Sequence, residues 1–116
     1  MPYRDWEKRI EDILAAISDI QDWTQDKTRQ DLESDVKLAR AVLYCFVIIG
    51  EASANIPEDI QDKYGEIPWR LMSDMRNVMA HEYFQIDFQI VWSTIQKGLP
   101  VIVPILQSLL ENERCN

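Results

Sequence analysis

The most constraining feature of this sequence is an apolar run, Ala41–Gly50, inside a longer segment with helical spacing. The run is only about half the length that a bilayer-spanning helix needs, so it predicts a core helix instead. A helix that is apolar on every side is buried on every side. In so small a chain, we expect the surface around Cys45, Phe46 and Ile49 to be covered partly by a second copy of the protein.

Composition narrows the fold class. The chain has 116 residues, of which 47% are hydrophobic and 28% charged, as expected for one globular domain spanning residues 1–116. It has only three glycines and no short alternating runs, which favours an all-α fold. The N-terminus shows no apolar signal region, and Cys45 and Cys115 are not expected to pair. These features together predict a reduced, cytoplasmic protein.

The hydrophobic spacing predicts an up-and-down bundle of four to five helices, assembled as a homodimer. The last helix should be kinked or split by Gly98, Pro100 and Pro104. The expected helices are Asp5–Thr24, Arg29–Asn55, Pro57–Tyr64, Trp69–His81 and Asp87–Leu110. Thr28 with Asp31 resembles a capping arrangement at the start of the second helix, and Asp87 is a suitable N-cap for the last.

Net charge limits the functions that are open to the chain. The formal charge of −8 argues against a general nucleic-acid coat protein, which should be basic. If the protein handles RNA, its positive charge must be concentrated in one cleft. Arg70 with Arg76, or Lys37 with Arg40 on another helix, could supply that charge. The alternative is that all four are solvated surface charges.

The single histidine, His81, makes the search for reactive groups short. One short segment carries a cation, an amide, an imidazole and a phenol, on Arg76, Asn77, His81 and Tyr83 in that order. On one ideal helix Asn77 and His81 face the same way, whereas Arg76 and His81 splay by about 140°. Joint action of Arg76 and His81 therefore requires either a bend near Ala80 or a partner motif from a symmetry-related chain.

The spacing Arg76-x4-His81-x-Tyr83 resembles the signature of HepT toxins, which are prokaryotic members of the HEPN superfamily. Asn77, directly after the arginine, also fits that pattern. The resemblance extends over most of the chain, through Gly50-Glu51-Ala52, Ile67-Pro68-Trp69 and Leu99-Pro100.

The resemblance implies a metal-independent endoribonuclease toxin of a type VII-like toxin–antitoxin pair. It would cut RNA, such as tRNA or mRNA, by 2′-hydroxyl attack and leave a cyclic phosphate. Histidine titrates near neutral pH and suits general acid–base catalysis, and a guanidinium binds phosphate bidentately. His81 and Arg76 would take these roles, Asn77 would hold the imidazole or the phosphate, and Glu51 would support the site by pairing with Arg76. In this family two such motifs meet across a two-fold axis, so the site would be shared by the dimer.

The same resemblance implies an antitoxin partner of the minimal nucleotidyltransferase (MNT) type. That partner would silence the toxin by AMPylation of Tyr83, since the added charge and bulk would exclude the RNA phosphate. No cofactor, metal, DNA or membrane partner is expected. The cysteines, carboxylates and one histidine lack metal-ligand spacing, and the chain has no glycine-rich phosphate loop.

Two other functions are compatible with the same residues. The chain could be a non-catalytic helical subunit of a nucleotidyltransferase that binds a nucleotide or a partner, with Arg76 holding a phosphate. It could also be a helical protein whose bundle only dimerises. In either case His81 is a helix cap or a surface residue, and Tyr83 is an aromatic anchor for the last helix.

Overall fold

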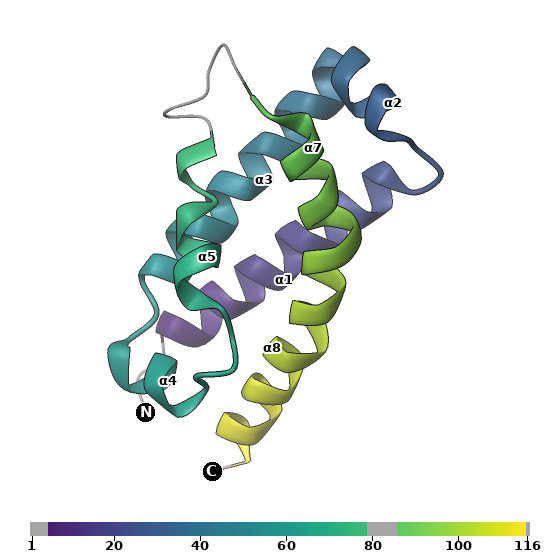
Figure 1. Cartoon of the computed structure of the whole chain (residues 1–116). Coiled ribbons are helices and arrows are strands. Elements are labelled where there is room, and N and C mark those ends of the chain that lie inside the picture. The colour runs from purple at the N-terminus through teal and green to yellow at the C-terminus, as the bar shows by residue number, and fades with distance from the viewer. Residues whose placement is uncertain (1–4, 79–85, 116) are drawn as a thin grey trace.

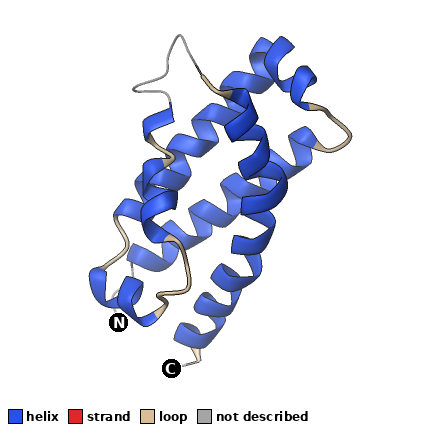
Figure 2. Cartoon of the chain, in the orientation of Figure 1, coloured by secondary structure: helices blue, strands red, loops and turns tan. Residues whose placement is uncertain are grey.

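The computed structural model describes residues 5–78 and 86–115, and every regular element in these two stretches is helical (Figures 1 and 2). This confirms the all-α prediction. Within these stretches the elements are α1 (Asp5–Thr24), α2 (Arg29–Ser34), α3 (Val36–Ala54), α4 (Glu58–Lys63), α5 (Trp69–Asp74), α7 (Phe88–Ser93), the π-helical segment η1 (Thr94–Gly98) and α8 (Leu99–Arg114). No helix in the described part of the chain is both long and apolar enough to cross a membrane.

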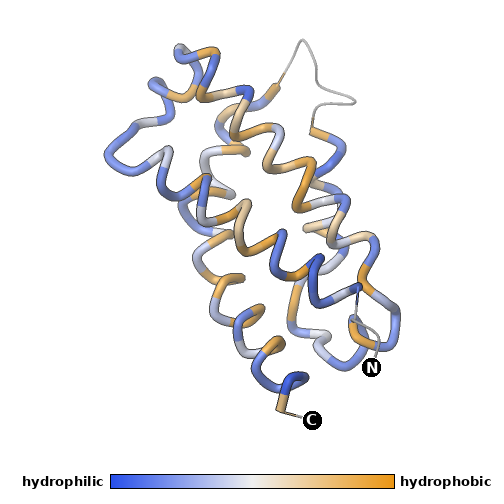
Figure 3. Tube along the Cα trace, turned by 180° about the vertical axis from the view of Figure 1, so that it is seen from behind, coloured by the Kyte–Doolittle hydropathy of each residue, from blue (hydrophilic) through white to orange (hydrophobic). Residues whose placement is uncertain are grey.

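The core is built around α1 and α3, which run side by side in opposite directions, with α5 packed on α3 and α8 on α1 (Figure 1). The predicted stripe of α1 is confirmed, because Ile10, Ile13, Ile17 and Ile20 are fully buried. Figure 3 shows hydrophilic and hydrophobic residues alternating along the helices, as amphipathic packing requires. The isoleucine stripe therefore sets where α1 meets the rest of the bundle.

The prediction of one uninterrupted helix over Arg29–Asn55 is wrong, because the chain leaves the helix at Asp35. The Asp35 backbone is extended, with φ −94° and ψ 100°, and its carboxylate accepts a hydrogen bond of 3.1 Å from the Leu38 N–H. Aspartate is a favourable N-cap, so it ends α2 and begins α3 at one residue. The predicted cap at Thr28 is present, as a reciprocal pair of bonds between Thr28 and Asp31.

The expectation that a second copy covers Cys45, Phe46 and Ile49 is also wrong. These side chains are only 4%, 3% and 0% exposed within one chain. The reason is that α3 lies between α1 and α5, which cover it from different sides (Figure 1). Tyr44 is the residue of the apolar run that faces outward, with 65% of its surface exposed.

The C-terminal region is split, as predicted, but the split is a π-helical segment. The Asp87 carboxylate caps α7 by accepting from the N–H groups of Gln89 and Ile90. The Leu99 N–H then bonds to the Thr94 carbonyl, five residues back, just before Pro100. A wider π turn leaves room for a proline ring that would clash with an ordinary helical turn. The α8 helix contains Pro104 and extends to Arg114, beyond the predicted end at Leu110.

A buried polar contact fixes α4 against the end of α8. The Tyr64 hydroxyl donates a 2.7 Å hydrogen bond to Glu113, and the Lys63 ammonium lies 2.7 Å from the same carboxylate oxygen. The hydrogen bond to Glu113, reinforced by burial, raises the pKa of Tyr64 above its ordinary value. The Trp69 indole N–H donates to the Tyr64 carbonyl at 3.1 Å, so this cluster also fixes the start of α5.

Candidate active site

Arg76 lies on a tight turn that interrupts the predicted helix Trp69–His81. The N–H groups of Met75 and Arg76 bond to the carbonyls of Met72 and Ser73, three residues back, at 3.1 and 3.3 Å. Helical geometry resumes at Asn77 and Val78, where the described stretch ends. An uninterrupted helix was therefore the wrong prediction, and the chain turns before Ala80.

The turn that carries Arg76 rests directly on Gly50. A Cβ atom added to Gly50 would lie 2.3 Å from the Arg76 amide nitrogen and 2.6 Å from the Arg76 Cβ, closer than real Cβ atoms approach. Glycine inside a helix costs about 1 kcal/mol relative to alanine, and here it allows two backbones to touch. Sequence reasoning did not assign this role. The available signal was a glycine inside an apolar helical run, away from either cap.

The expected contact between Glu51 and Arg76 is present. The two side chains approach to 3.6 Å, too far for a hydrogen bond, and form an ion pair in which they are 59% and 42% exposed. Such exposed pairs contribute about 0–1 kcal/mol. A phosphate that binds the guanidinium bidentately can therefore displace Glu51 at little cost.

The other predicted site residues are only partly within the described chain. Asn77 is exposed and lies directly after the Arg76 turn. His81 and Tyr83 lie outside the described residues.

An open groove of about 1240 Å³ borders this turn. Helix α5 and the residues that follow it form one wall, and α7, η1 and α8 form the other (Figure 1). The walls are mainly apolar and include Leu71, Ile90 and Val101, whose side chains are 71%, 64% and 63% exposed. Asn77 lines the groove, so its edge is continuous with the arginine-bearing turn.

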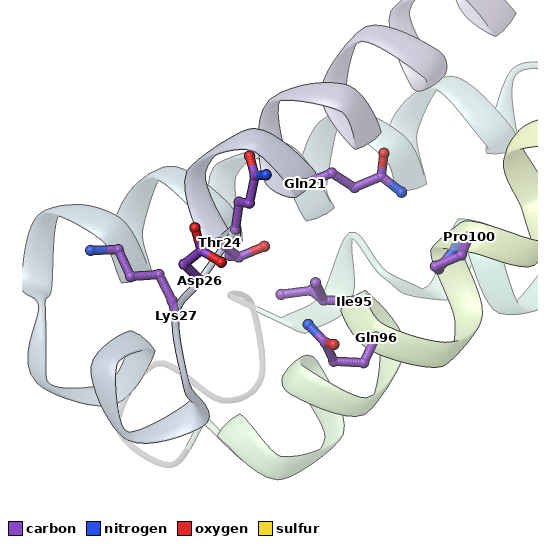
Figure 4. A pocket seen from close by; sticks show the side chains of 8 residues that line it. Gln21, Thr24, Asp26, Lys27, Ile95, Gln96 and Pro100 are labelled. Atoms are coloured by element: carbon purple, nitrogen blue, oxygen red, sulfur yellow. The ribbon is translucent and has the colours of Figure 1, made fainter.

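A second hollow, of about 270 Å³, lies between the end of α1 and the η1–α8 region (Figure 4). Its lining is mostly polar, and the Thr24 hydroxyl already donates to the Ile20 carbonyl at 2.7 Å. None of the predicted site residues lines it. Within residues 5–78 and 86–115, no cluster of three or more His, Cys, Asp or Glu side chains is placed to hold a metal ion.

An all-helical bundle that presents an arginine on a turn, in a chain with the Arg-x4-His-x-Tyr spacing, is consistent with the resemblance to the HEPN class. The family comparison is more specific, because residues 13–109 match the model described as "Ribonuclease HepT-like". The chain belongs to the HepT-like ribonuclease family.

Three relatives illustrate the similarity. A Methanocaldococcus jannaschii protein provisionally named an RNase is 33% identical over 112 residues, covering 97% of this chain and 93% of the relative. A Thermococcus cleftensis protein provisionally named ribonuclease HepT is 41% identical over 91 residues, covering 78% and 83% of the two chains. A Caldanaerobacter subterraneus protein, also provisionally named an RNase, is 30% identical over 105 residues, covering 90% and 94%. No solved structure matches the chain.

Proposed function

We propose that this chain is a metal-independent endoribonuclease toxin of a type VII-like toxin–antitoxin pair. The observation that carries the proposal is the placement of Arg76, whose backbone is seated on Gly50 and whose guanidinium forms an exposed ion pair with Glu51. An exposed cation on a closely packed backbone, with a displaceable counter-ion, suits a phosphate-binding site. Membership of the HepT-like ribonuclease family and the RNase names of the relatives point to RNA as the substrate.

The proposed reaction uses the nucleophile that RNA carries. His81 removes the proton of a 2′-hydroxyl, and the 2′-oxygen attacks the adjacent phosphorus. The bond from phosphorus to the 5′-oxygen breaks, and that oxygen takes up a proton. The products are a 2′,3′-cyclic phosphate and a 5′-hydroxyl. Arg76 binds the phosphoryl oxygens as charge develops on them, Asn77 orients the imidazole or the phosphate, and Glu51 is displaced when RNA binds.

Two copies of the chain share the site in this proposal, and the occupant of the apolar groove is the second copy. Leu71, Ile90 and Val101 form an exposed apolar surface of the kind that marks interfaces. The charged residues that line the groove are Glu66, Asp74, Asp87 and Lys97, so each copy offers both acidic and basic partners to the other. A two-fold axis would let the lysine of each copy face an acidic side chain of the other.

The metal-independent mechanism predicts that RNA cleavage persists in excess chelator, while DNA of the same sequence survives because it lacks the 2′-hydroxyl. Arg76→Ala and His81→Ala should each lower the initial rate at least about 100-fold, a typical contribution of such groups. The measurement uses labelled total RNA and a matched DNA. Arg9→Ala, which removes an exposed arginine from α1, is the matched control.

Two results would refute this mechanism: activity lost in chelator, or equal cutting of RNA and DNA. Binding of RNA without cleavage by the parent chain would instead favour the non-catalytic binding subunit.

Regulation in this proposal acts through Tyr83, which an MNT-type nucleotidyltransferase would AMPylate. Co-expression with the cognate transferase and ATP should add the mass of AMP at Tyr83 and abolish RNA cleavage without unfolding the chain, since only charge and access change. Tyr83→Phe should escape both effects, whereas Tyr44→Phe, at an exposed tyrosine on α3, should be silenced like the parent. Mass spectrometry that places the adduct on another residue, or a silenced Tyr83→Phe chain, would contradict the proposal.

A further inference from the structure

The outer face of α3 carries an ordered line of side chains that leads to Arg76. Lys37, Arg40, Tyr44 and Glu51 are all exposed. At 100° per residue they fall within a sector of about 60° on one side of the helix. Glu51 is the member that pairs with Arg76. We call Lys37, Arg40 and Tyr44 the α3 track.

The charge of the α3 track is unusual for this protein. The chain has a net charge of −8, yet α3 contains no acidic residue before Glu51. Within residues 5–78 and 86–115, neither Lys37 nor Arg40 has a carboxylate within ion-pair distance. The neighbouring Asp35 uses its carboxylate to accept the Leu38 N–H. Both cations are therefore available to an anionic ligand.

Tyr44 adds a second kind of contact to the track. It lies between the cations and Glu51 and is 65% exposed, although the residues beside it, Leu43 and Cys45, are buried. An exposed aromatic ring beside two exposed cations suits a single nucleic-acid strand, whose bases stack on rings and whose phosphates bind cations.

The length of the track fits several nucleotides. From Lys37 to Glu51 the helix rises about 21 Å, roughly the rise of six stacked nucleotides at about 3.4 Å each. One end of this path is the Glu51–Arg76 pair, where the proposed function places the scissile phosphate.

We infer that the α3 track binds a single-stranded segment of RNA next to the cleavage point and leads the scissile phosphate to Arg76. Lys37 and Arg40 contact phosphates, and Tyr44 stacks with a base. The identity of the ligand as RNA rests on the proposed function. A second protein chain fits this face less well, because lysine is depleted at protein interfaces and burying a cation without a partner is costly.

The test measures binding separately from cleavage. Its probe is a short, labelled, single-stranded 2′-O-methyl RNA of mixed sequence, which cannot be cut by 2′-hydroxyl attack. Fluorescence anisotropy gives the Kd as a function of salt concentration. Each phosphate contact to a single strand contributes about 0.7 to the slope of log Kd against log salt, so Lys37→Gln with Arg40→Gln should lower that slope by about 1.4.

Tyr44→Leu should weaken binding on the order of tenfold with an unchanged salt slope, because it removes stacking and no charge. Tyr44→Phe keeps the ring and should bind like the parent. The control for the double charge change is Lys8→Gln with Arg9→Gln, which removes two exposed cations from α1.

The possible failures are distinguishable. If the parent cleaves RNA but the α3 track variants bind the probe like the parent, the inference is wrong and the proposed function stands. If the parent cleaves no RNA but probe binding still depends on Tyr44 and both cations, the track is supported and the nuclease proposal fails. If Tyr44→Leu changes the sedimentation coefficient and leaves probe binding intact, the face binds protein and the inference is overturned.

Discussion

Replacing Gly50 by alanine is expected to lower RNA cleavage about 100-fold and to leave the helical bundle folded. The new methyl group would lie 2.3 Å from the Arg76 amide nitrogen, so the turn that carries Arg76 must move away from α3. Displacement of a catalytic group by about 1 Å can cost about 100-fold in rate. Overpacking costs about 1–3 kcal/mol of stability, offset in part by the roughly 1 kcal/mol that alanine gains over glycine in a helix.

Two controls show whether the Gly50 substitution acts by displacing Arg76. Gly65→Ala adds the same methyl group where the nearest contact is the Asp62 carbonyl oxygen at 3.7 Å, so its rate should match the parent. Gly50→Ala in an Arg76→Ala background should cause no further loss of activity, because effects that act through one residue are not additive. Circular dichroism and thermal unfolding verify that each variant folds.

The proposed role of Gly50 in positioning Arg76 is contradicted if the folded Gly50→Ala chain cleaves RNA at the parental rate. The proposed role is also contradicted if Gly50→Ala lowers the rate of the Arg76→Ala chain by the same factor by which it lowers the rate of the parent. The second result would mean that the substitution acts through stability or through another residue.

Local sequence signals predicted much of the fold. The isoleucine stripe of α1 is buried as its spacing indicates, and the caps at Thr28 and Asp87 are present. These features depend on residues within a few positions of each other. The break at Asp35 was missed because hydrophobic spacing continues across it, although an aspartate able to cap a new helix was visible.

Long-range features could not be predicted in the same way. The pairing of Glu51 with Arg76 was expected from the family resemblance, but the contact between Gly50 and the Arg76 backbone depends on how closely α5 packs on α3. The apolar run was assigned to an interface because its periodicity does not reveal that α1 and α5 cover it. The exposed apolar surface lies across α5, α7 and α8, where no single helix shows it as a continuous run.

A dimer formed through the groove is expected to dissociate when a charge is placed in it. Val101→Glu introduces a carboxylate at a side chain that is 63% exposed in one chain and would be desolvated between two. Sedimentation at micromolar concentration should show a monomer for Val101→Glu and a dimer for the parent. Val36→Glu makes the same change at a valine that is 58% exposed on α3, outside the groove, and should remain a dimer.

A heterodimer tests whether the two copies share their sites. One chain carries Arg76→Ala and the other His81→Ala, each with its own affinity tag, and the mixed dimer is isolated after co-expression. If each site combines Arg76 of one copy with His81 of the other, one site loses both groups and the other keeps both. The heterodimer should then recover about half of the parental activity, although both homodimers are inactive. An inactive heterodimer would contradict the pairing of Arg76 of one copy with His81 of the other, and failure to isolate any mixed species would contradict the dimer itself.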